Sequence, residues 1–246
     1  GKQAADALTS GACNIAMGLN ALGAATAATS MVAIGCGAMG GVTTGGLVEN
    51  IGIGRNALFG SASSTGNCNI GIGSNALYSL TTGAYNIAIG NGSADLLTTG
   101  GDNVAIGQNT LGSTASAGIS VAIGRAAMAT SASENYYNVA IGDCAMGAGD
   151  VSGAANVAIG RCAGKDNTSG SCNVSIGAFA GRCTTTGYDN ISIGKNAGCT
   201  VTTHNTVINI GADKNNTTTG TTCIGGTCVM AAQFTATSDC RSKKDI

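Results

Sequence analysis

Apolar and small residues alternate in a short phrase that recurs through the chain. In the copy at residues 69–73, Asn69 is followed by Ile70, Gly71, Ile72 and Gly73. Because residues two apart lie on the same face of a strand, the phrase predicts a short strand with its β-branched residues on one side and a tiny residue on the other. Copies of the phrase, some degenerate, end in Gly at positions 18, 35, 54, 73, 90, 107, 124, 142, 160, 177, 194, 211 and 225.

The spacing of these glycines predicts the fold. They lie 17 to 19 residues apart until the last interval, which is 14. A short, nearly constant period is typical of stacked repeats rather than of a globular core. We therefore predict an all-β fold, a parallel β-solenoid (β-roll or β-helix) of about 13 coils of 17–19 residues, associated as a homotrimer. We expect residues 1–12 to be a lead-in, 13–211 the solenoid, 212–237 a degenerate coil and linker, and 238–246 the start of another domain.

The Asn and Gly of the phrase are expected to hold the coils together. Stacked Asn side chains can bond to one another along a ladder and satisfy backbone groups at the bend. The final Gly fits a tight corner where a Cβ would clash or φ must be positive. The residues assigned these structural roles are Asn69, Ile70, Ile72, Gly73, Asn86, Gly90, Asn103, Gly107, Asn156 and Gly160.

A second interpretation of the Asn residues is glycosylation. Asn173-Val174-Ser175 and Asn190-Ile191-Ser192 match the acceptor pattern. The start of a strand inside a repeat is a poor acceptor, so the ladder is favoured there. Asn216, near the end of the repeats, is the better placed acceptor.

The tiny third residue of the phrase predicts a packed surface. We expect the Ile and Val residues to point into the coil, which places the third residue outside. A solvent-facing strand position would normally hold larger polar residues, so its smallness indicates contact with another copy of the chain. The residues predicted to pack between chains are Ala105, Ala122, Ala140 and Ala158.

The other side of each coil changes along the chain. The fourth residue after the phrase Gly is Leu or Met in early coils, such as Leu22 and Met39, and Gly in later ones, such as Gly164 and Gly181. This change predicts a core that thins toward the C-terminus. A turn rich in Thr and Gly follows, and its Gly lies three residues before the next Asn in most copies, so we expect it to set the register of the next strand.

Composition narrows the class of protein. With 41 Gly and no Pro, but no Gly-X-Y period, the chain is not a collagen. Hydrophobic residues make up 43% and recur in register, which argues against disorder. The chain lacks an apolar run long enough for membrane insertion, and its net charge of −1 gives no attraction to nucleic acid. Its start lacks Met, as expected for an internal fragment or a processed product.

The eleven cysteines do not form an obvious disulfide framework. Most occupy fixed coil positions where a thiol replaces Ala or Ser, so we expect reduced structural thiols. Cys144 and Cys162 are different because they hold the same position in neighbouring coils. At a rung spacing of roughly 4.8 Å, their Cα separation falls within the range of a disulfide.

The repeats over residues 13–211 resemble the head domains of trimeric autotransporter adhesins and the repeats of viral and phage tail fibres. The period is longer than that of the adhesin heads. The resemblance implies three chains along a threefold axis. The run from Ser238 through Ile246, which begins Ser-Asp-Cys-Arg-Ser-Lys, is similar to the opening of endosialidase-type intramolecular chaperone domains.

Such chaperone domains trimerise, template the β-structured stalk and often cleave themselves. The resemblance implies a cut between Ser238 and Asp239, with Ser238 as the nucleophile and Lys243 as its base. A Ser hydroxyl needs a nearby base, and a Lys can serve when burial lowers its pKa.

Together these features predict a homotrimeric shaft of a viral fibre or spike on the virion surface, contributing to host attachment. Its partners would be its own copies, other virion proteins, and a host-surface glycan or receptor. Apart from self-cleavage we expect no enzyme activity, no cofactor and no metal site, because the carboxylates are scattered and the single His204 fits a solvent-facing position.

Two alternatives remain. A bacterial adhesin head on the cell surface would share the repeats, and an ice-binding solenoid would explain the Thr pairs. The cations that directly follow a phrase Gly should share one outer edge, where they would either contact an anionic glycan or simply be solvated. These cations are Arg55, Arg125, Arg161 and Lys195.

Overall fold

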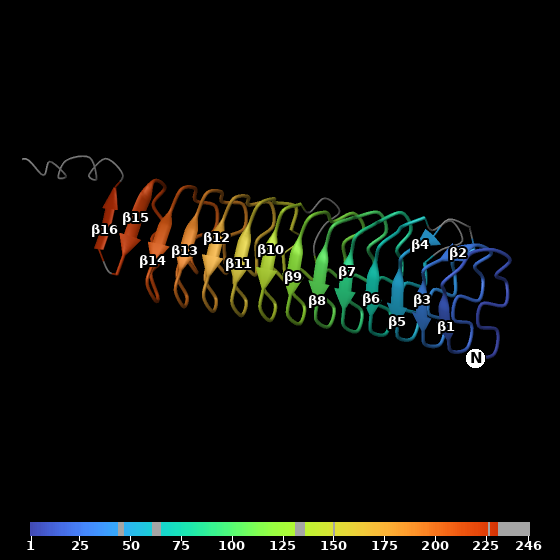
Figure 1. The fold of residues 1–246 in the computed structure, drawn as a ribbon. Coiled ribbons are helices and arrows are strands. Elements are labelled where there is room, and N and C mark those ends of the chain that lie inside the picture. The colour runs from blue at the N-terminus through green and yellow to red at the C-terminus, as the bar shows by residue number, and fades with distance from the viewer. Residues whose placement is uncertain (44–46, 61–64, 131–135, 150, 226, 231–246) are drawn as a thin grey trace, which may run out of the picture.

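The chain folds into a rod of stacked rungs (Figure 1). The computed structural model describes residues 1–43, 47–60, 65–130, 136–149, 151–225 and 227–230. Across these ranges the secondary structure is entirely β, with no helix. The predicted all-β parallel solenoid is confirmed.

Each copy of the phrase forms one strand of a long sheet. The strands in chain order are β1 (Ile15–Met17), β2 (Ala28–Thr29), β3 (Val32–Ile34), β4 (Leu47–Val48), β5 (Ile51–Ile53), β6 (Ile70–Ile72), β7 (Ile87–Ile89), β8 (Val104–Ile106), β9 (Val121–Ile123), β10 (Val139–Ile141), β11 (Val157–Ile159), β12 (Val174–Ile176), β13 (Ile191–Ile193), β14 (Ile208–Ile210), β15 (Thr221–Ile224) and β16 (Thr227–Met230). Strands β2 and β4 form a separate two-stranded parallel sheet, and the other fourteen described strands form the main one.

Equivalent residues lie directly above one another in the main sheet. Ile87 pairs with Val104 and Ile89 pairs with Ile106, and the same parallel register holds from β1 to β15. Only β16 runs antiparallel, against β15. At about 4.8 Å for each rung, the thirteen parallel strands give a rod on the order of 60 Å long.

The solenoid extends beyond the predicted boundaries. Residues 1–12, which the pattern assigned to a lead-in, already stack on the next rung: the Ala5 N–H donates to Ala21 O (2.9 Å) and the Thr9 N–H to Thr26 O (2.9 Å). At the other end β15 adds one more parallel strand after residue 211. The solenoid therefore begins before residue 13 and continues past residue 211.

The Gly that ends each phrase is required by the corner. Gly54 has φ of 131°, and a Cβ built on it would lie 2.5 Å from Gly73 O in the next rung. The same contact recurs rung after rung because each corner lies on the one before it. The predicted role of this Gly is confirmed.

The Asn ladder is also confirmed. Asn86 Nδ2 donates to Asn69 Oδ1 (3.1 Å) and to Gly100 O (2.9 Å), and Asn103 Nδ2 donates to Asn86 Oδ1 (2.9 Å). Each Asn thus joins three rungs and holds the Gly of the following turn, which fixes the register of the next strand.

Burial of the ladder excludes the glycosylation alternative for two positions. Asn173 and Asn190 are 4% and 3% exposed, and both amides are bonded within the stack. A glycan cannot be attached there without opening the rung. Asn216 lies in a half-exposed loop before β15.

The two faces of each strand are the reverse of our prediction. Ala105 and Ala158 are 1% exposed, and Ala122 and Ala140 are fully buried, within a single chain. These four residues therefore line the interior of the rung and do not pack between chains. The neighbouring Ile and Val residues point outward.

The reason for this inversion is the narrowness of the rung. A Cβ built on Gly52, the middle residue of β5 and the third of its phrase, would lie 3.1 Å from both Met39 Cε and Ala57 O. The strand thus packs directly on the opposite corner, where the Leu and Met residues project inward. This position holds Gly, Ala or Ser in every copy except two, where it is Asn209 and Cys223.

The interior changes along the rod, as the Leu-to-Gly pattern predicted. Met128 and Met146 are buried in the middle rungs. In the later rungs Gly181 and Gly198 take that place, and any side chain there would collide with Ser175 or Ser192. Larger residues on the strand are thus compensated by smaller ones on the corner.

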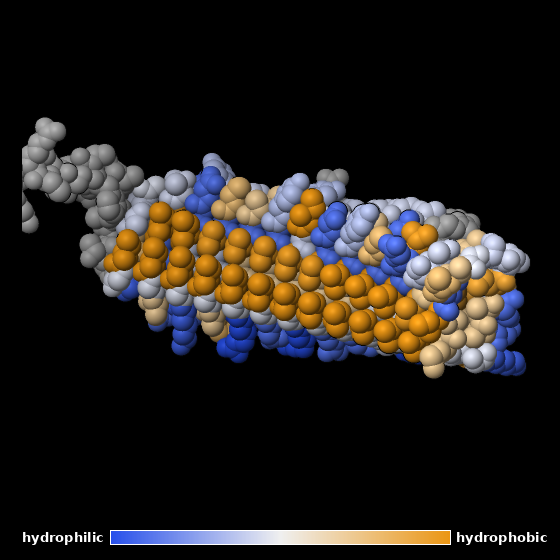
Figure 2. Space-filling model, in the orientation of Figure 1, coloured by the Kyte–Doolittle hydropathy of each residue, from blue (hydrophilic) through white to orange (hydrophobic). Residues whose placement is uncertain are grey.

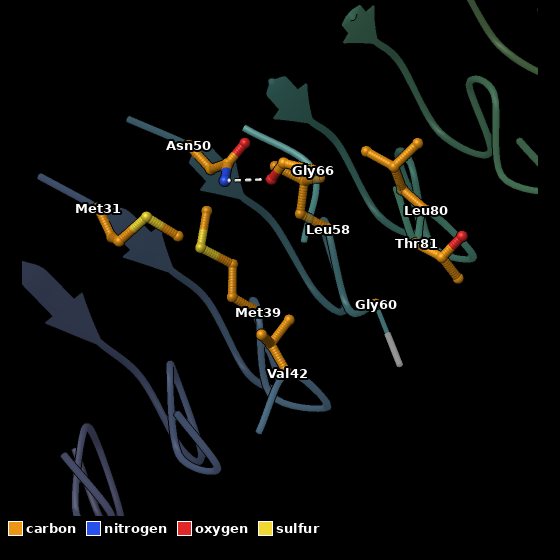
Figure 3. Close-up of a pocket in the computed structure, with 9 residues that line it drawn as sticks. All are labelled: Met31, Met39, Val42, Asn50, Leu58, Gly60, Gly66, Leu80 and Thr81. Atoms are coloured by element: carbon orange, nitrogen blue, oxygen red, sulfur yellow. Dashed lines mark hydrogen bonds between the residues drawn. The ribbon is translucent and has the colours of Figure 1, made fainter. Parts of the chain in front are cut away.

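The longest rungs border a small, partly open cavity of about 20 Å³. Figure 3 shows Met31, Met39 and Leu58 converging on it, beside the hydrogen bond from Asn50 Nδ2 to Gly66 O (2.9 Å). This volume is far below that of a small-molecule site. The cavity therefore reflects imperfect packing of long rungs.

Candidate interaction surface

The outward side chains of the strands form one continuous apolar face. The second and fourth residues of each phrase stack into two columns, because every strand pairs in register with the next. We call this surface the Ile/Val face. Its first column is Ile15, Val32, Ile51, Ile70, Ile87, Val104, Val121, Val139, Val157, Val174, Ile191 and Ile208, and its second is Met17, Ile34, Ile53, Ile72, Ile89, Ile106, Ile123, Ile141, Ile159, Ile176, Ile193 and Ile210.

The Ile/Val face is accessible along the whole rod. Figure 2 shows it as two unbroken apolar rows. Ile89 is 37% and Ile159 is 36% exposed, and the other β-branched residues between these two are half-buried. Three residues at about 3.3 Å each across twelve rungs at about 4.8 Å give an area on the order of 600 Å².

Tyrosines line one long edge of this face. Tyr85, Ile119 and Tyr137 each occupy the residue before the first residue of a phrase, and all three are more than half exposed. Tyr136 and Tyr188 lie one residue earlier in their rungs and are exposed as well. Four of the five tyrosines in the chain therefore border the Ile/Val face.

Charged residues occupy the opposite edge, beyond the phrase Gly. Arg125 Nη2 lies 2.8 Å from Asp143 Oδ1, which holds the same position one rung later. Arg55 donates to Ser74 Oγ at 3.4 Å. The predicted common edge for the cations that follow the phrase Gly agrees with this register.

Two shallow polar grooves lie among the corners on this side. One, of about 310 Å³, is lined by Asp95, Asn109 and Ser113. Burial raises the pKa of Asp95, and backbone hydrogen bonds partly oppose that effect. The other, of about 390 Å³, lies near the first rungs, where the Phe59 ring stacks on Tyr78 with centroids 5.3 Å apart.

The disulfide that the spacing of Cys144 and Cys162 would allow does not form, because both are free thiols. Side chains at the same position of adjacent rungs project in parallel at about 4.8 Å, whereas a disulfide brings its Cβ atoms to about 3.8 Å. Burial, followed by the charge of Asp143, raises the pKa of the Cys144 thiol. Eight cysteines of the described ranges are free, as expected, but Cys223 is disulfide-bonded.

His204 is not the solvent-facing residue that we predicted. Its side chain is half-buried, and its Nδ1 atom is shielded and has no hydrogen-bond partner. Its carbonyl accepts a hydrogen bond from Asn190 Nδ2 (2.7 Å), so the residue closes the last step of the Asn ladder. No acidic residue or Cys joins it in a metal-binding group within the described ranges.

The Thr residues of the second turn have a structural role. Thr81 Oγ1 donates to Thr98 O (2.9 Å), and Thr98 Oγ1 donates to Ala115 O (2.8 Å). The same bond joins Thr168 to Thr185 O (3.0 Å). In these Thr pairs the hydroxyl of the first Thr therefore donates to a backbone carbonyl of the next rung. That hydroxyl is not free to bind ice.

The remaining predictions about sites fall at the C-terminus. Ser238, Asp239 and Lys243 lie outside the described residues. In the described part of the chain, no helix has the length and apolar character needed to span a membrane.

Comparison with family models, curated proteins and solved structures finds no match for this chain.

Proposed function

We propose that this chain is a shaft segment of a homotrimeric fibre or spike on a virus particle. The observation that carries the proposal is the Ile/Val face, which runs along one side of a rod. A shaft needs length, stiffness and lateral association, and stacked rungs with a lengthwise apolar face supply all three.

The size of the Ile/Val face favours coverage by protein. Contiguous apolar patches of several hundred Å² mark interaction surfaces on soluble proteins. An area on the order of 600 Å², extended by the Tyr edge, is within the size range of such interaction surfaces. A second copy fits best because its own face has the same length and the same rung spacing.

The two columns of the face suit three chains better than two. When three rods surround an axis, each can offer one column to either neighbour, and the ring then closes without leaving an open face. The Tyr residues at the edge would contact the neighbouring rod, since Tyr is enriched at such interfaces. This interface replaces the alanine surface that the sequence pattern predicted.

The C-terminal segment gives the shaft a means of alignment. Neighbouring rungs are nearly identical, so three chains could associate one rung out of step at little cost. A trimeric chaperone domain that begins near Ser238 would align the chains before the rungs form. In a chain extended by that whole domain, we expect cleavage between Ser238 and Asp239, and Ser238→Ala should abolish the released fragment. A wild-type extended chain that trimerises but is never cut would contradict the assigned cleavage.

Imaging locates the chain in its biological setting. Particles and cells from the source should be labelled with an antibody against the rod and viewed by electron microscopy. We expect label on fibres or spikes of virus particles. Label on a bacterial surface would instead support the adhesin head, and absence from virus particles would overturn the proposal.

A further inference from the structure

Two arginines share one aromatic ring in the later rungs. Phe179 lies at the second residue after Gly177 and is half-buried. The guanidinium carbon of Arg161, from the preceding rung, lies 4.5 Å from the ring centroid. That of Arg182, from the same rung as Phe179, lies 5.7 Å from it. Both distances are within the range of a cation–π contact.

Neither arginine is neutralised by a carboxylate at contact distance. Both are exposed, and the ion pair found in the described ranges joins Arg125 to Asp143 instead. Arg182 interacts with the Cys183 thiol, and this hydrogen bond raises the pKa of the guanidinium, with a smaller effect from the charge of Asp166. Two unpaired cations are thus held together at the protein surface.

Two carboxylates and two further cations lie near the pair. Asp143 holds the position of Arg161 one rung earlier and is bound to Arg125, and Asp166 acts on Arg182 through its charge. The Asp166 N–H donates to Arg182 O (2.9 Å), so Lys165 lies next to Arg182 across the rung step. Lys195 follows Gly194, at the position that Arg161 occupies after Gly160. Asp189 precedes Asn190 and therefore lies at the Tyr edge of the sheet, away from this group. The local charge is positive in a chain whose net charge is −1.

A bound anion would reduce the repulsion between the two guanidinium groups. Like charges repel when they are brought close, and Phe179 offsets only part of that repulsion. An arginine side chain that is held against a ring loses less conformational entropy when it binds a ligand. Its planar guanidinium can also donate two parallel hydrogen bonds to the oxygens of a carboxylate or sulfate group.

We propose that Arg161, Phe179 and Arg182 form a binding site for the carboxylate or sulfate groups of an acidic polysaccharide. This inference rests on the attachment role proposed above and specifies the class of ligand for that role. It lies within a single chain and does not require the trimer. A polysaccharide is favoured over nucleic acid because the cationic group is short: along its edge it is interrupted by Ala178 and bounded by Asp143 and Ala212, whereas nucleic acid demands many neutralised phosphates.

Calorimetry with defined probes tests the site. The full chain should be titrated, at about 0.15 M salt, with a heparin oligosaccharide, a hyaluronan oligosaccharide, neutral dextran and single-stranded DNA. We expect binding of heparin, of hyaluronan or of both, and none of dextran. The stronger of the two acidic probes identifies sulfate or carboxylate as the preferred group.

Variants show whether the cluster is responsible. Arg161→Ala and Arg182→Ala should each weaken binding about tenfold or more, and Phe179→Leu should weaken it a few-fold because the guanidinium groups lose their support. Arg55→Ala is the matched control. Arg55 follows a phrase Gly in the same way and donates to Ser74, and among the described residues no aromatic ring is found in a cation–π contact with it.

Several outcomes would overturn the proposal. These are no binding of either acidic probe, equal loss in Arg55→Ala and Arg161→Ala, or DNA binding as tight as that of the oligosaccharides. The arginine variants should keep the wild-type β signal in circular dichroism, since these arginines are exposed. A chain that is monomeric but binds heparin would contradict the proposed shaft and leave this site intact.

Discussion

At the scale of single residues, neighbouring side chains on one strand have opposite roles. Ala158 is buried against the corner and Ile159 faces outward. At the same position of β6, a Cβ built on Gly71 would already lie 3.2 Å from both Leu58 Cγ and Ala76 O, so this position has little room for a side chain larger than Ala. The size of the third residue therefore sets the width of the rung.

Ala158→Leu should destabilise the rung itself. Overpacking of a filled core costs about 1–3 kcal/mol, and we expect a lower melting temperature in circular dichroism. Ala212→Leu, at an exposed position after a phrase Gly, is the matched control and should melt like the wild type. Equal melting of the two variants would contradict the interior position of Ala158.

Asp95 should make stability depend on pH. Burial raises its pKa in the folded chain, so ionisation disfavours the fold at neutral pH, and this penalty disappears as pH falls below the ordinary value of an Asp. Asp95→Asn should therefore melt higher than the wild type at about pH 7, with the difference lost at about pH 3. A difference that is the same at both pH values would argue against burial as the cause.

The sequence predicted the structure correctly at positions where only one physical requirement explains the residue type. Gly at the corner and Asn at the start of the strand were predictable because few other residues allow the close backbone contact or the repeated amide bond. The small third residue was not, because crowding inside a rung and crowding between chains select the same residues. Which side of the strand faces the corner depends on rung width, and no alternation pattern encodes that width.

At the scale of elements, the Asn ladder ties each strand to the turn that precedes the next one. Asn86 is 1% exposed and bonds to groups in both neighbouring rungs. The ladder is interrupted at Met31, Ser120 and Val207, whose backbone N–H groups still donate to the preceding Asn. The ladder thus stabilises the rod most where several successive rungs each carry an Asn.

Asn86→Ala should open the rungs around it. The change leaves buried partners such as Gly100 O and the Asn103 N–H unsatisfied, at about 1–3 kcal/mol for each group. Hydrogen exchange should increase in β7 and β8 and stay unchanged in β13, because rungs contact only their neighbours.

Asn91→Ala provides the control for that experiment. Asn91 is exposed in a corner of the same rung, so its loss should change stability by no more than about 0.5 kcal/mol. Uniform exchange along the whole rod in Asn86→Ala would contradict a local role for the ladder.

At the scale of the whole molecule, regular stacking creates the surface that one chain cannot cover. Every rung adds two aliphatic side chains to the Ile/Val face, so its area grows with the number of rungs. The period was readable from the sequence, and so was the presence of two aliphatic columns. The Arg161–Phe179–Arg182 cluster was not, because Arg182 reaches the ring from a different position in the rung.

The mass of the chain in solution tests the central claim most directly. Sedimentation equilibrium of the wild-type chain should give three times the 23.6 kDa of one chain. Ile106→Asp combined with Ile141→Asp places two charges on the Ile/Val face and should give a folded species of one chain mass. A wild-type chain that sediments as a monomer, or a double variant that remains trimeric, would contradict association through this face.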